Sequence, residues 1–368
     1  IPMVRLIDFH MCDFLMVLNY HTYGNLLIYP WGYAQSLYTP DSALFVEYAK
    51  VMTEQNNYTY GTGDQTVGYI VNGDSDDWQY GEQTTKGKAL SFTPEAGDND
   101  DGFWPTSSRI IPISKSNLRQ NLNYAHLAGK YARVEDRSPT TLSNITSYID
   151  FEIKRLGLDS PATFTVNLVP ISAQIASVGG PVVFTAMSLL ETRIDSISLD
   201  LIAGINDGDQ IKFLLNIDNG SFIVSDTITK TYGTGISVFT DNASSITNWT
   251  SGGSWAITTE DYHSPPSSFT DSPGGDHDNS VTSSLFLNDT IDLTNALSAK
   301  LNFWARWELE TGYDYVQVQA SNDFGANWIP LCGQYTKIGN SSQDEGNPVF
   351  NGFQFEWVLE EMDLSDFL

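Results

Sequence analysis

Three side chains suited to acid–base or metal chemistry stand beside apolar segments in the first third of the chain. His21 follows the run from Leu15 to Leu18, which we expect to be a buried strand, and Glu95 ends another apolar segment. Tyr69 lies in a glycine-containing segment. An imidazole at a strand end can bind a metal, although a single histidine is more often structural. A carboxylate can accept a proton from water, although a glutamate after a strand is normally only solvated. The residue types alone therefore leave these roles open.

The elements that would hold these residues alternate between helix and strand over residues 1–134, which predicts an α/β domain. A short helix is predicted over residues 3–13. Another is predicted to begin at Thr39-Pro40-Asp41, which offers a capping hydroxyl and a proline at the first helical position. Its predicted apolar face consists of Leu44, Phe45, Tyr48, Ala49 and Met52. A last helix is predicted from Ser116 to Tyr131, with Leu118, Leu122 and Ala125 facing inward.

Beyond Val134 the chain is rich in Thr, Ser, Asn, Asp and Gly, and strand patterns replace helical ones. Apolar residues alternate with polar ones from Phe164 to Leu168 and from Ile197 to Leu201, which is typical of half-buried strands. A glycine-rich join at 232–235 divides this region. We therefore predict three domains: 1–134, a β-sandwich over 135–234, and a β-rich domain over 235–368.

The composition excludes some classes of partner. The chain carries 18 Lys and Arg against 45 Asp and Glu, a net charge of −27, which would repel nucleic acids and anionic membrane surfaces. Hydrophobic residues make up 41%, enough for packed cores. No stretch approaches the ~20 apolar residues of a membrane-spanning helix. We expect no nucleic acid partner and no membrane span.

The segment around His21 is the most distinctive of the chain. It reads Asn19-Tyr20-His21-Thr22-Tyr23-Gly24, followed by an apolar strand and Tyr29-Pro30-Trp31-Gly32-Tyr33. This string resembles the zinc carboxypeptidase family of the carboxypeptidase A, B and T type, in which the pattern is roughly His-Ser/Thr-Tyr, an apolar strand, and Tyr-Pro-Tyr-Gly-Tyr. The resemblance implies that His21 is the third protein ligand of one Zn²⁺ ion.

Two further segments resemble the same family in its order and spacing. The stretch from Tyr69 to Trp78 resembles the loop that carries the family's substrate-clamping tyrosine, which implies substrate binding by Tyr69. The stretch Leu90-Ser91-Phe92-Thr93-Pro94-Glu95 resembles its strand ending in Phe-Thr-x-Glu, followed here by Gly-Phe-Trp-Pro and Ile-Ile-Pro. The resemblance implies that Glu95 is the catalytic carboxylate and that Thr93 lies at the substrate site.

The same resemblance implies a specificity. In the family, the residue two before the loop's tryptophan lies at the floor of the pocket for the departing side chain, and an aspartate there selects Lys or Arg. Here that residue is Asp76, and Asp74 resembles a second acid of the broad-specificity bacterial members. We expect a preference for C-terminal Lys or Arg, with tolerance of apolar residues if Asp74 faces the pocket. The alternative is that Asp76 points to solvent.

Other parts of the family pattern are absent from this sequence. The first two zinc ligands of the family come from a His-x-x-Glu motif, and none occurs among the five histidines here. The arginines that bind the substrate carboxylate are not matched either. We interpret the first domain as the C-terminal half of a truncated catalytic domain, and we expect these 368 residues by themselves to hydrolyse nothing.

The last domain resembles immune inhibitor A and MAM-type jelly rolls. The resemblance rests on Trp255-Ala256-Ile257, Ser267-Ser268-Phe269, Leu301-Asn302-Phe303-Trp304 and Tyr313-Asp314-Tyr315. Such domains can bind Ca²⁺. The conceivable oxygen ligands are Asp271, Asp276, Asp278 and Asp314, although acidic turn residues are common in an acidic protein.

Together these features predict a secreted zinc metallocarboxypeptidase that acts on peptides and proteins, with β domains for stability, anchoring or substrate capture. Two alternatives remain. One is a hydrolase of the same fold that acts on cell-wall peptides or amides. The other is a non-catalytic adhesion or carbohydrate-binding protein, with cell-surface or glycan contacts through the β domains.

Overall fold

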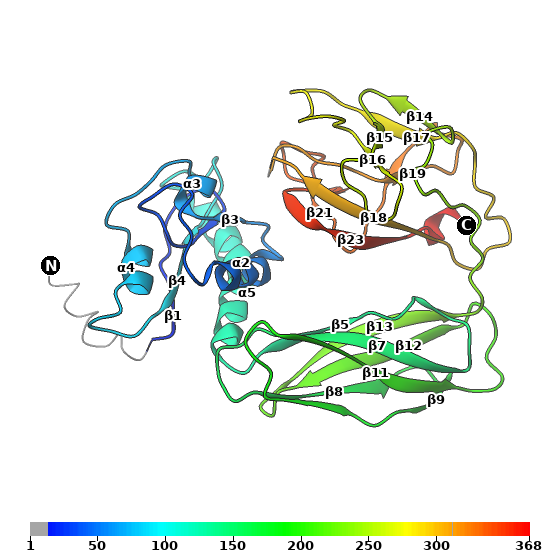
Figure 1. Cartoon of the computed structure of the whole chain (residues 1–368), viewed down its shortest axis with the longest axis horizontal. Coiled ribbons are helices and arrows are strands. Elements are labelled where there is room, and N and C mark those ends of the chain that lie inside the picture. Colours follow the sequence, from blue (N-terminus) through cyan, green and yellow to red (C-terminus); the bar gives the residue numbers. More distant parts are fainter. Residues whose placement is uncertain (1–13, 311) are drawn as a thin grey trace. The chain divides into compact units, whose positions relative to one another are not determined.

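A computed structural model of the chain describes residues 14–310 and 312–368. The helix predicted over residues 3–13 lies outside the described residues. The chain divides into two compact units, one up to Thr234 and the other from Gly235 to Leu368 (Figure 1). The first unit contains an α/β part followed by a β-rich part, and the second unit is almost entirely β.

The α/β part is built on a mixed four-stranded sheet in the order β1-β4-β2-β3. Its strands are β1 (Met16–Leu18), β2 (Leu26–Ile28), β3 (Thr59–Gly61) and β4 (Leu90–Glu95). β1 runs parallel to β4, β4 antiparallel to β2, and β2 parallel to β3. The predicted strand at Leu15–Leu18 is present but only half-buried, and Leu15 is exposed.

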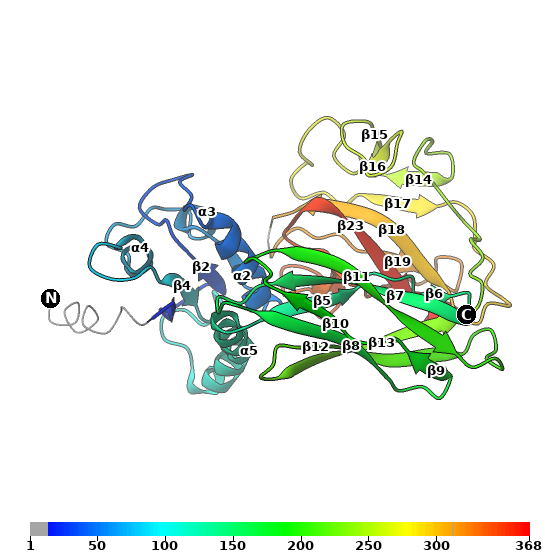
Figure 2. The same cartoon turned by 60° about the horizontal axis from the view of Figure 1, so that its bottom comes forward.

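Among the residues that the structure describes, four α-helices accompany this sheet. They are α2 (Ser42–Thr53), α3 (Gly63–Thr66), α4 (Ser75–Gly81) and α5 (Ile110–Ala128), with a 3₁₀ turn at Ser107–Arg109 before α5. α2 and α5 lie side by side, and α4 packs against β4 (Figures 1 and 2). The predicted apolar face of α2 is confirmed, because all five of its residues are buried.

The predicted start of α2 is wrong by two to three residues. The helix begins at Ser42, and Asp41 makes no side-chain cap. The Asp41 carboxylate instead accepts hydrogen bonds from Tyr80 and Lys88. Those distant partners could not be read from the local sequence.

The predicted inward face of α5 is also wrong. Leu118, Leu122 and Ala125 are exposed, and the buried residues are Asn117, Gln120, Asn123, Tyr124 and Leu127. Two of the inward amides donate to neighbours: Asn117 donates to the Tyr58 hydroxyl at 2.8 Å, and Asn123 donates to the Val51 carbonyl at 2.7 Å. The Gln120 side-chain oxygen accepts from Asn56, whereas its Nε2 atom has no hydrogen-bond partner among the described residues. Buried amides are stable where such partners exist. The helix also starts six residues before the predicted Ser116, because Pro112 is tolerated in a first turn.

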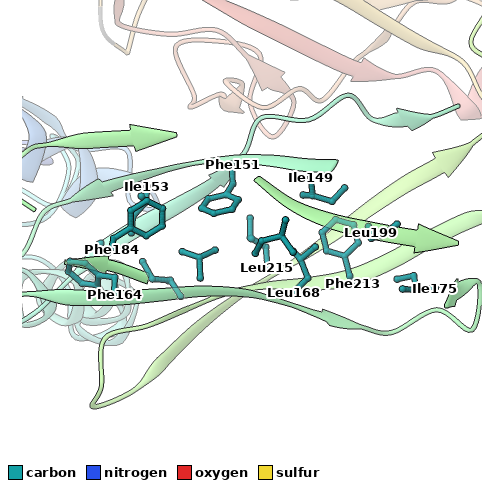
Figure 3. Close-up of a cluster of buried hydrophobic side chains, with 14 of the residues drawn as sticks. Ile149, Phe151, Ile153, Phe164, Leu168, Ile175, Phe184, Leu199, Phe213 and Leu215 are labelled. Atoms are coloured by element: carbon teal, nitrogen blue, oxygen red, sulfur yellow. The ribbon is translucent and has the colours of Figure 1, made fainter. Parts of the chain in front are cut away.

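The β-rich part of the first unit consists of two antiparallel-dominated sheets around one core. One sheet has the order β10-β8-β12-β13-β6, and the other has the order β5-β7-β11-β9. Their strands are β5 (Ala132–Asp136), β6 (Thr141–Leu142), β7 (Thr146–Arg155), β8 (Thr163–Pro170), β9 (Ile175–Val178), β10 (Val182–Thr185), β11 (Thr192–Leu201), β12 (Gln210–Asp218) and β13 (Ile223–Tyr232). The alternating residues predicted in β8 and β11 point inward, where aromatic and aliphatic side chains of both sheets meet (Figure 3).

The described residues of the second unit, 235–310 and 312–368, form five two-stranded sheets. Its strands are β14 (Trp249–Gly252), β15 (Ala256–Thr258), β16 (Ser268–Thr270), β17 (Ser284–Leu287), β18 (Lys300–Glu308), β19 (Gln319–Ala320), β20 (Ile329–Pro330), β21 (Lys337–Ile338), β22 (Pro348–Val349) and β23 (Phe353–Asp363), with a 3₁₀ turn at Ser365–Phe367. A small core holds Leu309, Leu331, Phe350 and Met362. The resemblance of this unit to a jelly roll stays a prediction. In the described part of the chain, no helix has both the length and the apolar character needed to cross a membrane.

Candidate active site

Parallel strand pairing brings His21 and Glu95 together. β1 and β4 pair in parallel, and the pairing continues beyond β1, with the His21 amide donating to the Pro94 carbonyl at 2.9 Å. The Ala96 amide in turn donates to the His21 carbonyl at 3.0 Å. The two side chains therefore leave adjacent strand ends, and His21 Nδ1 lies 3.5 Å from Glu95 Oε1. Residues 74 positions apart in sequence thus form one candidate site.

The two side chains differ in exposure. The His21 ring is 66% exposed, whereas the Glu95 side chain is 12% exposed. A surface hollow of about 410 Å³ beside the ring is lined by Tyr20, His21, Thr22 and Ala96. Glu95 Oε2 is buried and has no hydrogen-bond partner among the described residues. Burial raises the pKa of Glu95, while the nearby His21 acts in the opposite direction.

Tyr69 lies on the segment between α3 and α4 and is 60% exposed. The Val71 amide of this segment donates to the Gly32 carbonyl at 2.8 Å. The Gly32 and Tyr33 amides in turn donate to the Asp77 carboxylate of α4, at 2.9 and 3.1 Å. Asp77 therefore ties α4 to the Tyr29–Tyr33 segment and, through it, to the segment that carries Tyr69.

Asp76 points inward from α4 and is 1% exposed, so it does not face solvent. Its carboxylate accepts hydrogen bonds from the Ser91 hydroxyl at 2.5 Å and from the Thr93 hydroxyl at 2.6 Å. Ser91, Thr93 and Glu95 alternate along β4, and the period of two places them on one face. Burial raises the pKa of Asp76 to about 7, although the two hydroxyl donors oppose this shift.

Asp74 and Asp76 occupy different positions. Asp74 is the N-cap of α4, where its side chain accepts from the Asp76 amide at 3.1 Å. The Tyr29–Tyr33 segment passes close to the Asp74 side chain. If Gly32 carried a Cβ atom, that atom would lie 3.0 Å from Asp74 Oδ2. The negative charge of Asp74 also contributes to the raised pKa of Glu95. Asp74 is thus electrostatically linked to Glu95, whereas Asp76 is bound to Thr93.

Sequence reasoning missed two contacts at this site. Ser91 and Gln79 form a buried polar cluster with Asp76, in which the single proton of the Ser91 hydroxyl can be donated either to the Asp76 carboxylate or to the Gln79 side-chain oxygen. The position of Ser91 could have been predicted, because Ser91 precedes Thr93 by two residues on the same strand and therefore lies on the same face. No comparable signal marks Gln79, whose position depends on how α4 packs on β4.

The described residues do not by themselves form a zinc site of the expected kind. A catalytic zinc ion takes three protein ligands, and the described residues bring one imidazole, that of His21, to this site. Across residues 14–310 and 312–368, no cluster of three or more His, Cys, Asp or Glu side chains is arranged to hold a metal ion. The same observation removes support for the Ca²⁺ site expected from Asp271, Asp276, Asp278 and Asp314.

Comparison with known proteins finds a family that is similar to the first part of the chain. Residues 3–120 match the family described as zinc carboxypeptidase. They include His21, Tyr69, Asp74, Asp76, Thr93 and Glu95. The match supports a carboxypeptidase-like fold for this part.

Individual proteins are similar to part of the chain at low identity. Carboxypeptidase A1 of Bos taurus is 36% identical over 110 residues, which cover 28% of this chain and 25% of that protein. Carboxypeptidase B of Rattus norvegicus is 34% identical over 119 residues, which cover 31% and 26%. A structure of bovine thrombin-activatable fibrinolysis inhibitor with tick carboxypeptidase inhibitor shares 22% identity, covers 33% of this chain and 42% of that chain, and has a TM-score of 0.30. The chain spans about a quarter of the length of the first two relatives.

Proposed function

We propose that this protein is a secreted zinc carboxypeptidase that removes C-terminal residues from peptides and proteins, with a preference for Lys and Arg. The observation that carries the proposal is the 3.5 Å approach of His21 Nδ1 to Glu95 Oε1 at the ends of two paired strands. These are the two positions at which the sequence resembles a zinc ligand and a catalytic base. Exposure of the ring and a hollow beside it leave room for a substrate.

Glu95 is suited to proton transfer. One of its oxygens is buried without a hydrogen-bond partner among the described residues, and burial raises its pKa. A carboxylate with a raised pKa is a better base toward water and a better acid toward a leaving amine. Glu95 would take the proton of the attacking water and return it to the departing amine.

His21 would be one of the protein ligands of zinc, and zinc would supply Lewis-acid chemistry when bound. The site requires a His-x-x-Glu segment in addition to these residues, because the described chain offers one imidazole there. Tyr69 would donate its hydroxyl to the substrate, since an exposed tyrosine on a connecting segment can move toward a ligand.

The preference for basic residues rests on Asp76. The Asp76 carboxylate is buried, and its hydrogen-bond donors among the described residues are neutral hydroxyls. A cationic substrate side chain would stabilise this carboxylate, because the ion pair offsets the cost of desolvation. A substrate side chain that does not reach Asp76 would lie near Asp74 instead. This arrangement is consistent with some tolerance of apolar C-terminal residues in the substrate. Thr93 would then lie at the same pocket, since it is bonded to Asp76.

The test is kcat/KM on peptides that differ only in their last residue, measured on an extended form of the protein that carries a His-x-x-Glu segment. We expect Arg or Lys to be favoured over Leu, and Asp76→Ile to reverse the ratio. Loss of one partner of a buried charge pair typically costs about 2–5 kcal/mol, which corresponds to a change of thirtyfold or more. An unchanged ratio in Asp76→Ile would remove Asp76 from the pocket, and absence of any C-terminal trimming would reject the proposed activity itself.

A further inference from the structure

The C-terminal end of α5 is completed by a segment that begins at the last residue of β7. The last turn of a helix leaves carbonyl groups without intrahelical partners. Here the Leu158 amide donates to the Leu127 carbonyl at 2.9 Å, and the Asp159 amide donates to the Gly129 carbonyl at 3.2 Å. We call Arg155–Asp159 the junction segment. It belongs to the β-rich part, yet it supplies donors to the end of a helix of the α/β part.

The junction segment passes so close to α5 that one position has no space for a side chain. A Cβ built on Gly157 would lie 2.1 Å from the Gly129 carbonyl oxygen and 2.3 Å from the Tyr131 nitrogen. Both obstacles are backbone atoms, which cannot turn aside as a flexible side chain can. The Gly157 amide also donates to the Tyr131 carbonyl at 2.7 Å. Glycine is therefore required here by the close approach of two backbones.

Arg155 holds the junction segment in its curved path. The residue is 5% exposed, and its guanidinium donates to the carbonyls of Gly157 at 3.2 Å and Asp159 at 3.1 Å. It also donates to the Met187 carbonyl, between β10 and β11. A buried guanidinium is costly unless its donors are satisfied, and these carbonyls satisfy several of its five N–H groups. The guanidinium group of Arg155 therefore stabilises the backbone path of the junction segment.

The side chains of the two parts share one core at the same place. Leu156 is 2% exposed and packs in the cluster formed by α2, α5 and β4, with Leu158 and Leu190 against it. The Tyr48 hydroxyl of α2 donates to the Leu156 carbonyl at 2.6 Å. Removing the β-rich part would therefore expose apolar core surface of the α/β part and leave buried polar groups unpaired.

Contacts at the rim extend the junction. Lys154 pairs with Glu47 of α2, and Arg133 of β5 pairs with Glu54 at 2.6 Å. The ring of His126 lies 5.0 Å from that of Phe222, centroid to centroid. Partly exposed ion pairs contribute little individually, so the buried contacts carry the energy.

We propose that the β-rich residues 132–234 are the obligate stabilising partner of the α/β part, so that residues 14–234 open and unfold as one cooperative unit. The junction segment is the interaction surface, and its partner is the C-terminal end of α5 together with α2. A β-rich appendage that only tethers or captures a substrate would instead be joined by an exposed linker with few contacts. This inference does not depend on the proposed activity.

The experiment is hydrogen exchange on the full chain, which reports the opening free energy of each helix and strand. Leu199→Ala creates a cavity in the β core, since Leu199 is completely buried in β11. Such changes typically cost about 2–5 kcal/mol, a loss of protection of roughly thirtyfold or more. We expect the amides of α2 and α5 to lose protection by the same factor as those of β7 and β12. If this variant does not fold, Ile149→Val tests the same point with a smaller loss.

Two further variants make the result specific. Arg155→Lys keeps the charge but cannot reach the same carbonyls, because an ammonium lacks the planar fork of a guanidinium. In that background we expect Leu199→Ala to affect the β strands more than α2 and α5. Met362→Ala, buried in the second unit, is the matched control and should leave residues 14–234 unchanged. The proposal is overturned if Leu199→Ala lowers protection in β7 and β12 while that of α2 and α5 stays within twofold of wild type.

Discussion

Asp76 shows how burial of a single carboxyl group makes stability depend on pH. Its pKa is raised from 3.8 to about 7 because the carboxylate is buried, with the Ser91 and Thr93 hydroxyls as its neutral hydrogen-bond donors. The folded state therefore binds a proton more tightly than the unfolded state. The resulting stability is fully present below about pH 4, near the unfolded pKa, and is lost as the pH rises toward the folded pKa of about 7.

We predict that Asp76→Asn removes this part of the pH dependence. Relative to wild type, the variant should gain stability between pH 5 and pH 8, on the order of 2 kcal/mol, since one pKa unit corresponds to about 1.4 kcal/mol. The measurement is the free energy of unfolding by urea across that range. Asp100→Asn, at an exposed position, is the control and should follow wild type. Parallel curves for wild type and Asp76→Asn would show that Asp76 does not titrate in this range.

The titration of Asp76 also predicts that the preference for C-terminal Arg over Leu depends on pH in the extended form. Above about pH 7 the free carboxylate of Asp76 is charged and attracts a cationic side chain; below it the neutral acid does not. The ratio of kcat/KM for C-terminal Arg to that for Leu should therefore rise between pH 6 and pH 8, and Asp76→Asn should flatten it. A ratio that is constant with pH in wild type would contradict this assignment.

At the scale of elements, α4 acts as an anchor for the segments around the site. Asp77 accepts the Gly32 and Tyr33 amides, and Gly32 accepts the Val71 amide near Tyr69. We predict that Asp77→Ala raises hydrogen exchange at residues 31–34 and 69–72 and costs about 1–3 kcal/mol, because the partly buried Gly32 amide and the exposed Tyr33 amide lose a charged acceptor. Asp77→Asn keeps one acceptor oxygen and should lie between Ala and wild type. If Asp77→Ala leaves exchange at 69–72 unchanged, the link to Tyr69 is absent.

The elements also show what the sequence could and could not predict. The apolar face of α2 followed directly from its 3.6-residue spacing, and the β-core strands followed from their alternation. The orientation of α5 did not, because its buried face is polar and depends on partners such as Tyr58 and Val51 that are distant in sequence. The motif order placed His21 and Glu95 in one site, but the approach of their side chains required the parallel pairing of β1 with β4.

The division of the chain into two compact units after Thr234 should be visible in proteolysis and in thermal unfolding. The connection around Ile236 and Val238 is exposed and has no regular secondary structure. We predict that limited proteolysis cuts at 235–240 before either unit is degraded, since exposed connections between compact units are preferred sites. Thermal unfolding should show separate transitions for residues 14–234 and 235–368. A single transition that Met362→Ala shifts as a whole would contradict the independence of the two units.

The proposed role of Glu95 as the general base is tested most directly by Glu95→Gln in the extended form that carries a His-x-x-Glu segment. We predict that the variant binds zinc and peptide like wild type but loses turnover by a hundredfold or more, because an amide cannot accept the proton of the attacking water. Zinc content and peptide affinity, measured beside kcat on the same sample, separate loss of chemistry from loss of folding. A kcat near that of wild type would show that Glu95 is not the base of this site.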